Sequence, residues 1–201
     1  MWLVGFDLDM TLIDSRPQTM AAFTELAGET GVSIDLAEVD RRLGIKLEDE
    51  VAYWFPPGQQ AAAVDIYRRH YIRLATEETT ALPGARDALA AVRAAGDRVV
   101  VITAKHPISA EPSLRAAGLI VDELFTHVHG PEKAAVLRKL RAAVYVGDSP
   151  PDMAAAVAAG VPAVGVATGS FDARELYDAG ADVVLDSLGG FASWYSAFAT
   201  S

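Results

Sequence analysis

The stretch WLVGFDLDMT, residues 2–11, decides the fold of this 201-residue chain. Its first part is an apolar run with the length and the valine and aromatic content of a buried strand. The run stops at Asp7 and Asp9, which alternate with Leu8, so both carboxylates can face the same side of the strand. In an open parallel sheet, ligands bind at the carboxyl ends of the strands. The pattern therefore places two acids where such a sheet would hold its ligand.

Further short apolar runs follow this stretch at regular spacing. The clearest is RVVVIT at 98–103, and others lie at 124–128, 143–146, 162–166 and 182–185. Helical patterns separate these runs at 85–95, 107–117, 131–142 and 150–159. Strands that alternate with helices at this spacing favour right-handed crossovers. We therefore predict an α/β fold, a Rossmann-like parallel sheet with helices on both faces.

Residues 15–80 break this alternation, because they contain no convincing strand. Three or four helices are expected there, at roughly 17–28, 35–43, 46–55 and 59–76, with a turn signal in FPPG at 55–58. The segment is too long for a single crossover between two strands. We predict an α/β core made of residues 1–14 and 81–201, and an α-helical module inserted at 15–80.

Composition and charge exclude several classes of protein. Apolar residues make up 51% of the chain, which is enough for a buried core and argues against disorder. With 17 basic and 27 acidic residues the net charge is −10, so we expect no nucleic-acid partner. The chain has no cysteine, which rules out disulfides, zinc thiolates and a cysteine nucleophile and fits a reducing cytoplasm.

No membrane partner is expected either. The N-terminus lacks a basic segment before its apolar run and reaches an acid at Asp7. The longest uncharged stretch, 153–171, is interrupted by three glycines and a proline, which indicates a helix, a turn and a buried strand. We therefore expect a cytoplasmic protein. The sequence leaves the oligomeric state and the pathway open.

Three later positions add groups suited to phosphate. Thr103 ends a predicted strand just before a helix, where its hydroxyl and nearby N–H groups can hold a phosphate oxygen or cap the helix. Lys133 lies one turn into another helix, where it offers a compact positive charge or forms an ordinary surface lysine. Asp148 follows a strand as Asp7 does. Asp152 with Ser149 also makes a helix-capping pair, so capping alone can explain Asp152.

Two neighbouring carboxylates need a cation between them or a proton on one of them. Asp7 and Asp9 therefore indicate Mg²⁺ binding with acid–base work, although an isolated pair of this kind can also be an exposed strand end.

As a set, these motifs resemble those of the haloacid dehalogenase (HAD) superfamily of phosphohydrolases. The match consists of DxDxT at 7–11, Thr103, Lys133 and GDxxxD at 147–152. Residues 11–15 (TLIDS) look like the lead into the helical cap of its phosphoglycolate phosphatase-like branch, and the tail from 160 to 184 is similar to that branch's ending. Met10 stands where a glycine is commoner, and Ala134 follows the lysine where proline is frequent. The resemblance covers nearly the whole chain.

The resemblance implies a chemistry for the acids. Asp7 would be the nucleophile that forms an aspartyl-phosphate, and Asp9 would protonate the leaving oxygen and then take a proton from water. Mg²⁺ would be held by the Asp7 carboxylate, the Asp9 carbonyl and Asp148. Asp152 would lie behind these ligands or reach the metal through water.

The resemblance also implies a phosphate cradle. Thr103 and the backbone N–H groups of Leu8 and Ala104 would bind phosphate oxygens, together with Lys133. Lys105 is the rival for the lysine's role.

The inserted helices would form a cap that closes over the site. Arg42, Gly44, Lys46 and Lys105 are candidates for contacts with an anionic substrate, although the cap residues are as well explained by a solvated helix face. His127 and His129 are interpreted as structural or supporting residues, because no third metal ligand lies close in sequence.

The function expected from the resemblance is Mg²⁺-dependent hydrolysis of a small phosphate monoester, such as phosphoglycolate. Dehalogenases of the superfamily typically lack the second aspartate of the first motif, so Asp9 favours phosphoryl transfer. One alternative is a phosphomutase acting on a sugar phosphate with the same core, which would differ in what the cap admits. The other is a non-catalytic phosphate-binding protein, which would be expected to have lost one of the four carboxylates.

Overall fold

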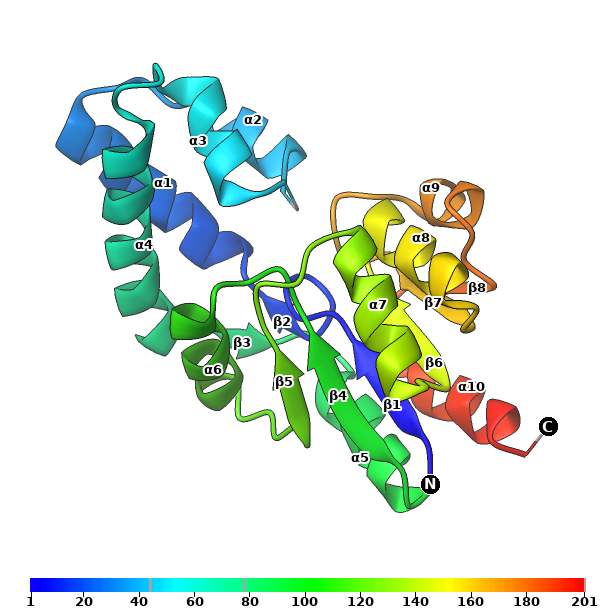
Figure 1. Cartoon of the computed structure of the whole chain (residues 1–201). Coiled ribbons are helices and arrows are strands. Elements are labelled where there is room, and N and C mark those ends of the chain that lie inside the picture. Colours follow the sequence, from blue (N-terminus) through cyan, green and yellow to red (C-terminus); the bar gives the residue numbers. More distant parts are fainter. Residues whose placement is uncertain (44, 78, 201) are drawn as a thin grey trace.

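A single parallel sheet forms the centre of the chain (Figure 1). The structure is a computed structural model and describes residues 1–43, 45–77 and 79–200. Six strands lie in the order β5-β4-β1-β6-β7-β8, and each neighbouring pair is parallel. Their bounds are β1 Leu3–Phe6, β4 Arg98–Ile102, β5 Glu123–Phe125, β6 Val144–Gly147, β7 Ala163–Val166 and β8 Val183–Leu185. The predicted α/β fold is confirmed, and the decisive first strand lies in the interior of the sheet.

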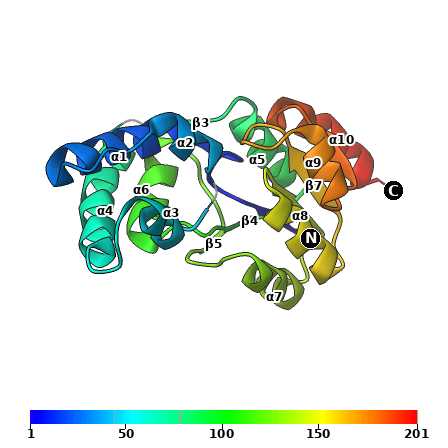
Figure 2. The same cartoon turned by 90° about the horizontal axis from the view of Figure 1, so that it is seen from above.

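Helices cover both faces of the sheet because the strand residues alternate between two hydrophobic cores. Val99 and Val101 of β4 pack in the core beneath α5 (Ala85–Ala94), α6 (Pro107–Ala116) and α10 (Phe191–Phe198), where the short 3₁₀ turn η1 (Leu188–Gly190) also lies. Val100 and Ile102 face the core beneath α7 (Pro131–Leu140), α8 (Pro150–Ala159) and α9 (Ala173–Asp178). Seen from above, α5 and α7 lie on opposite sides of the sheet (Figure 2).

Proline and glycine set the ends of the core helices. In α8, Pro150 occupies the first turn, where its missing N–H costs nothing, and Gly160 follows the last residue with a φ of 71°. The Gly160 N–H closes the helix by donating to the carbonyl of Ala156. These predicted bounds agree with the structure, and they place the first turn of α8 beside the end of β6.

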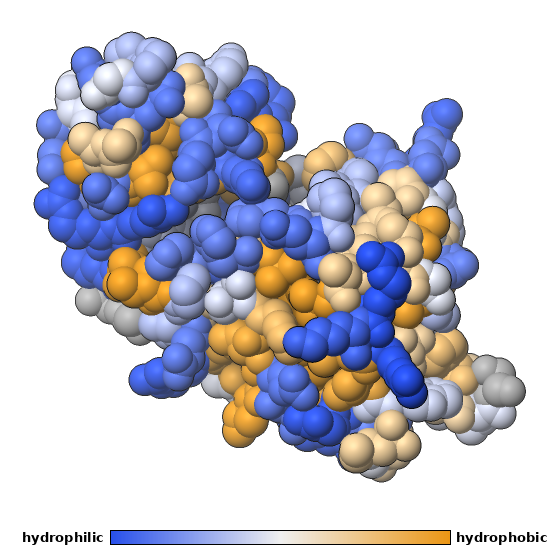
Figure 3. Space-filling view, viewed as in Figure 1, coloured by the Kyte–Doolittle hydropathy of each residue, from blue (hydrophilic) through white to orange (hydrophobic). Residues whose placement is uncertain are grey.

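The inserted segment forms a helical cap with a hydrophobic core of its own. Its helices are α1 Arg16–Thr30, α2 Leu36–Arg41, α3 Leu47–Trp54 and α4 Gln60–Glu77. Phe23, Val51 and Tyr67 are among the buried residues that hold them together. The helix α4 packs against α6 of the α/β core, and the surface is indented between cap and core (Figure 3).

The junction between cap and core contains a feature that the sequence did not predict. Where the chain enters and leaves the cap, β2 (Ile13–Asp14) pairs antiparallel with β3 (Thr80–Ala81). The start of α1 also differs from the usual pattern, since the Ser15 side chain makes no capping hydrogen bond and the Asp14 carboxylate accepts from the Arg16 N–H at 3.1 Å. Within the described ranges, no helix combines the length and apolar character that a bilayer crossing requires.

Candidate active site

The candidate active site lies at the carboxyl edge of the sheet, in a cavity of about 710 Å³ between core and cap. Asp7 follows β1, Thr103 follows β4 and Asp148 follows β6, and these three strands are neighbours. The first turns of α8 and α7 add Asp152 and Lys133. All five side chains line the same cavity, as the alternation of strands and helices predicted.

Three carboxylates meet at the floor of this cavity. Asp7, Asp148 and Asp152 each offer an oxygen within 4.8 Å of the others, and none is more than 7% exposed. The Lys133 ammonium donates to Asp7 Oδ1 and to Asp152 Oδ1, each at 2.6 Å. The Thr11 hydroxyl donates to Asp148 Oδ1 at 2.9 Å. One buried ammonium therefore faces three buried carboxylates.

Burial and the neighbouring charges shift the pKa values of Asp7, Asp148 and Lys133. Burial, opposed by Lys133 and reinforced by Asp152, raises the pKa of Asp7 to about 7. Burial, with Asp152 and Asp7 nearby, raises the pKa of Asp148 well above its ordinary value. Burial by itself would lower the pKa of Lys133, yet Asp152 and Asp7 raise it well above its ordinary value. The floor of the cavity thus carries a surplus of negative charge.

The donor set fits a small divalent cation. Carboxylate oxygens are the ligands that Mg²⁺ prefers, and a cation would offset the surplus charge. Two glycines make room for the acids: a Cβ on Gly169 would lie 2.0 Å from Asp148 Oδ2, and one on Gly147 would lie 2.5 Å from Asp152 Cβ. The carboxylates can crowd together only because these positions carry no side chain.

The chain matches the haloacid dehalogenase-like hydrolase family over residues 4–156. It belongs to this family. It is 30% identical to the phosphoglycolate phosphatase of Nitrosospira multiformis, over 92% of this chain and 91% of that protein. Its fold is similar to that of a haloacid dehalogenase-like hydrolase of Streptococcus pneumoniae, with a TM-score of 0.85 and 22% identity over 97% and 98% of the two chains. It is also similar to CbbY of Rhodobacter sphaeroides, solved in complex with phosphate, with a TM-score of 0.79 and 24% identity over 94% and 96%.

The two rival lysines of this hydrolase have separate partners. Lys133 pairs with the buried triad, whereas the Lys105 ammonium donates to Asp9 Oδ1 at 2.6 Å and to the Tyr71 hydroxyl at 2.5 Å. Tyr71 belongs to α4 of the cap, so Lys105 links Asp9 to the cap. Tyr71 could not be singled out from the sequence, because it falls in the buried apolar stripe of its helix.

Thr103, which the sequence placed in a phosphate cradle, is 1% exposed. Its hydroxyl oxygen accepts from the Lys105 N–H at 3.1 Å. Thr103 does not cap α6, because the N-cap residue is His106, whose Nδ1 accepts from the Ile108 N–H. Ala104 lines the cavity, and the buried side chain of Leu8 packs in the core, which leaves only its backbone for a ligand.

Asp152 contacts Ser149, its predicted partner, but through a bond between the two side chains and not through a capping bond. The Ser149 hydroxyl donates to Asp152 Oδ2 at 2.5 Å and makes no capping bond to the backbone of α8.

The first motif, DxDxT at 7–11, contains a residue with a positive φ angle. Met10 adopts a φ of 60°, in the left-handed region that glycine enters more easily. Its carbonyl accepts from the Thr168 hydroxyl at 2.5 Å, which helps to hold this turn.

The residues expected to contact an anionic substrate lie in different environments. Arg42, Lys46 and Lys105 all line the cavity. The Nε of Arg42 lies 2.7 Å from Glu50 Oε2, so this guanidinium is already paired with a carboxylate that is 5% exposed. Gly44 lies outside the described residues. The cavity is also lined by His106, His127 and His129. The last two were expected to be structural or supporting residues.

Proposed function

We propose that this hydrolase is a Mg²⁺-dependent phosphatase that cleaves a small phosphate monoester of the phosphoglycolate kind through an aspartyl-phosphate on Asp7. The observation that carries the proposal is the contact of Lys133 with both Asp7 and Asp152 inside a cap-covered cavity. A nucleophilic carboxylate beside a buried ammonium can accept a phosphoryl group whose negative charge would otherwise repel it. The 30% identity to a phosphoglycolate phosphatase supports the choice of ester.

In the first step, an Asp7 oxygen forms a bond to phosphorus while the bond from phosphorus to the ester oxygen breaks. Asp9 gives a proton to that leaving oxygen. In the second step, water attacks the phosphorus of the aspartyl-phosphate, Asp9 takes the proton of the water, and Asp7 leaves as a free carboxylate. Asp9 suits this role because it is the less buried acid of the motif, with its side chain 33% exposed and held by Lys105.

Phosphate would be bound by Lys133, the Thr103 hydroxyl and the N–H groups of Leu8 and Ala104. Asp7, Asp148 and the Asp9 carbonyl would hold Mg²⁺, with Asp152 behind them or reaching it through water. When bound, the cation would neutralise charge on the phosphoryl group as it is transferred.

The cap has a part in this proposal. We assign residues 15–80 to the cap and residues 1–14 and 81–201 to the core. The contact of Lys105 with Asp9 and Tyr71 would hold the proton-transferring acid in place while the cap excludes water.

The test is phosphate release from a panel of small phosphate esters, with Mg²⁺ and then with EDTA. Wild type is compared with Asp7→Asn and with Asp178→Asn, an equivalent change at a carboxylate whose side chain is 75% exposed. We expect release only with Mg²⁺, a loss on the order of 10³-fold or more in Asp7→Asn, and full activity in Asp178→Asn. Undiminished release by Asp7→Asn would refute the nucleophile. Movement of phosphate between positions of one sugar would indicate a mutase, and binding without turnover would indicate a non-catalytic protein.

A further inference from the structure

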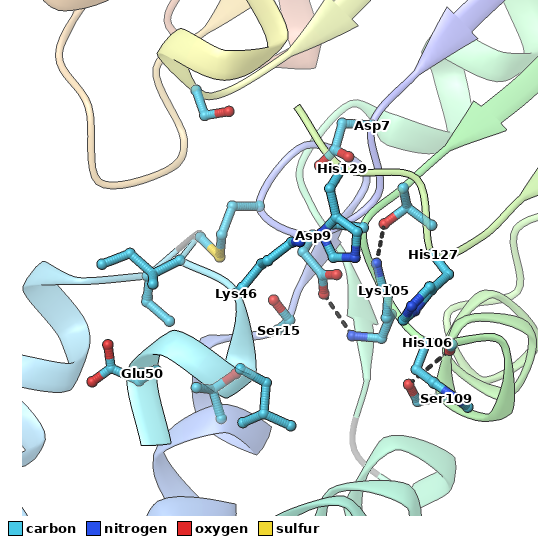
Figure 4. Close-up of a pocket in the computed structure, with 18 of the residues that line it drawn as sticks. Asp7, Asp9, Ser15, Lys46, Glu50, Lys105, His106, Ser109, His127 and His129 are labelled. Carbon is cyan, nitrogen blue, oxygen red and sulfur yellow. Dashed lines mark hydrogen bonds and ion pairs between the residues drawn. The ribbon is translucent and has the colours of Figure 1, made fainter. Parts of the chain in front are cut away.

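Three histidines form a stack on the wall of the cavity. His106 and His127 lie edge to face with ring centres 5.7 Å apart, and His127 and His129 do the same at 5.1 Å. His106 is the N-cap residue of α6, and the other two belong to the loop between β5 and α7. All three line the cavity together with Lys46 of the cap (Figure 4).

The backbone fixes this histidine stack in position. His127 has a φ of 59°, in the left-handed region that residues other than glycine rarely adopt. Its N–H donates to the Lys105 carbonyl, and the next N–H along the chain, that of Val128, donates to the Thr103 carbonyl, each at 3.0 Å. The histidine loop is thereby anchored to the segment that carries Thr103. A non-glycine residue held in this region is often part of a functional site.

The tautomer of His106 is set by the helix that it caps. Its Nδ1 accepts from the Ile108 N–H at 3.3 Å, so the neutral ring carries its proton on Nε2. His129 is tied down through its backbone, since its N–H donates to Glu132 Oε2 at 3.0 Å. Neither contact uses the Nε2 position of a ring, which leaves that nitrogen for a ligand.

Charged side chains of both signs surround the stack. Burial, with Arg68 and His127, lowers the pKa of His106, and burial, with Lys46 and His127, lowers the pKa of His129. Positive charges are therefore close enough to oppose protonation of the rings.

Two carboxylates lie at the same end of the cavity. Glu48 pairs with Arg68 at 2.5 Å, and Glu132 accepts from the His129 backbone N–H. Both act against Lys46 and His127 by raising the pKa of His129, and Glu48 does the same against Arg68 for His106. Lys105 is paired with Asp9, whereas Lys46 has no carboxylate within 4 Å in the described part of the chain. Lys46 is therefore a cation without an ion-pair partner there, and it lies beside three imidazole rings that can donate N–H groups to an anion.

We propose that His106, His127, His129 and Lys46 form a second anion subsite, which binds the carboxylate of a phosphorylated carboxylic acid while its phosphate lies at Asp7. The inference rests on the proposed function and deepens it. It names which end of the cavity selects the substrate, and it predicts that esters without a second negative charge are poorer substrates. An anion beside the rings would favour their protonated form, so binding would take up a proton.

The test compares esters of equal length with and without a carboxylate. Phosphoglycolate is paired with 2-hydroxyethyl phosphate, and 3-phosphoglycerate with glycerol 3-phosphate, so that two lengths are covered. The ratio of kcat/KM within each pair is measured for wild type, His127→Asn, His129→Gln and Lys46→Gln. Asparagine suits position 127 because it tolerates the left-handed region. His70→Gln is the matched control, because His70 pairs with Glu29 on the cap and does not line the cavity.

We expect wild type and His70→Gln to prefer the carboxylate ester in at least one pair, and each subsite variant to reduce that preference about tenfold. The wild-type preference should fall as the pH rises through the range in which His106 and His129 titrate, which lies below that of free histidine because their pKa values are lowered. A preference that stays within twofold of wild type in all three variants would overturn the subsite but leave the phosphatase intact. Wild type that prefers the uncharged esters would overturn it as well.

A binding measurement separates this proposal from the phosphatase reaction. Histidine ring NMR signals of Asp7→Asn are followed against pH with phosphoglycolate and with 2-hydroxyethyl phosphate. We expect the midpoints of the signals from the stack to move to higher pH with phosphoglycolate alone, while the His70 signal stays in place. Midpoints that move equally with both esters, or with neither, would refute the subsite. If wild type releases no phosphate from any ester, the proposed reaction fails, and this measurement still decides whether the carboxylate is bound.

Discussion

Replacing Lys133 with methionine should destabilise the metal-free protein strongly and in a pH-dependent way. The side chain is 5% exposed and its ammonium contacts two carboxylates at 2.6 Å. Methionine fills a similar volume and removes only the charge. Loss of one partner from a buried ion pair costs about 3–5 kcal/mol, because the remaining charge is left without compensation. For a chain of this size, that loss corresponds to a drop of about 6–20 °C in Tm.

The sign of the pH dependence follows from Asp7. Its pKa in the folded protein is about 7 against an ordinary value of 3.8, so the folded state keeps its proton where the unfolded chain has lost it. Stability therefore falls as pH rises from about 4 to about 7, and removing Lys133 raises the folded pKa further. The destabilisation caused by Lys133→Met should be smaller at pH 5, where Asp7 is already protonated, than at pH 8.

Urea unfolding in EDTA at pH 5 and pH 8 measures this effect. Lys139→Met is the control, since Lys139 lies on the same helix with its side chain exposed. A loss below about 1 kcal/mol at pH 8, or an equal loss at both pH values, would show that the buried ammonium does not hold the carboxylates together.

Three further outcomes can be checked on the same protein. Gly169→Ala would place a Cβ 2.0 Å from Asp148 Oδ2 and displace the Asp148 carboxylate, so the affinity for Mg²⁺ measured by calorimetry should fall about 10–100-fold. An unchanged affinity would exclude Asp148 as a ligand of the cation. The affinity of wild type for Mg²⁺ should rise with pH up to about 7 and then level off, because the cation competes with the proton of Asp7. An affinity that does not change with pH below 7 would contradict this competition. Tyr71→Phe removes the hydroxyl that accepts from Lys105 and should lower kcat/KM about tenfold in steady-state assays, whereas unchanged kinetics would argue against a role for this cap contact in holding Asp9.

The α/β core could be predicted because its signals are local. Pro150 and Gly160 mark the ends of one helix, and the apolar run before Asp7 marks a strand, so the order of the elements follows from neighbouring residues. The antiparallel pair of β2 and β3 could not be predicted, because two residues show no periodicity. The contact at the start of α1, where Asp14 and not Ser15 accepts from the Arg16 N–H, depends on side-chain placement that neighbouring residues do not reveal.

The candidate site was predictable as a set of positions but not as a set of contacts. Asp7 and Asp148 could be placed together because parallel strands end at one edge. The sequence could rank Lys133 above Lys105, but the separate partners of these lysines depend on how the helices lie over the sheet. The importance of His106 was not apparent, because its ring meets His127 only when the segments after β4 and β5 come side by side.

The position of β1 within the sheet has a consequence for synthesis on the ribosome. Its Leu3 pairs with Arg98 and its Val4 with Val144, so its second neighbour is made 140 residues later. At typical rates of about 5–20 residues per second, the first strand waits roughly 7–28 s for that partner. The cap helices are made within this interval and have a hydrophobic core of their own. The cap can therefore fold first, while Phe6 and Leu8 stay exposed to chaperones until β6 emerges and the nucleophile at Asp7 gains its surroundings.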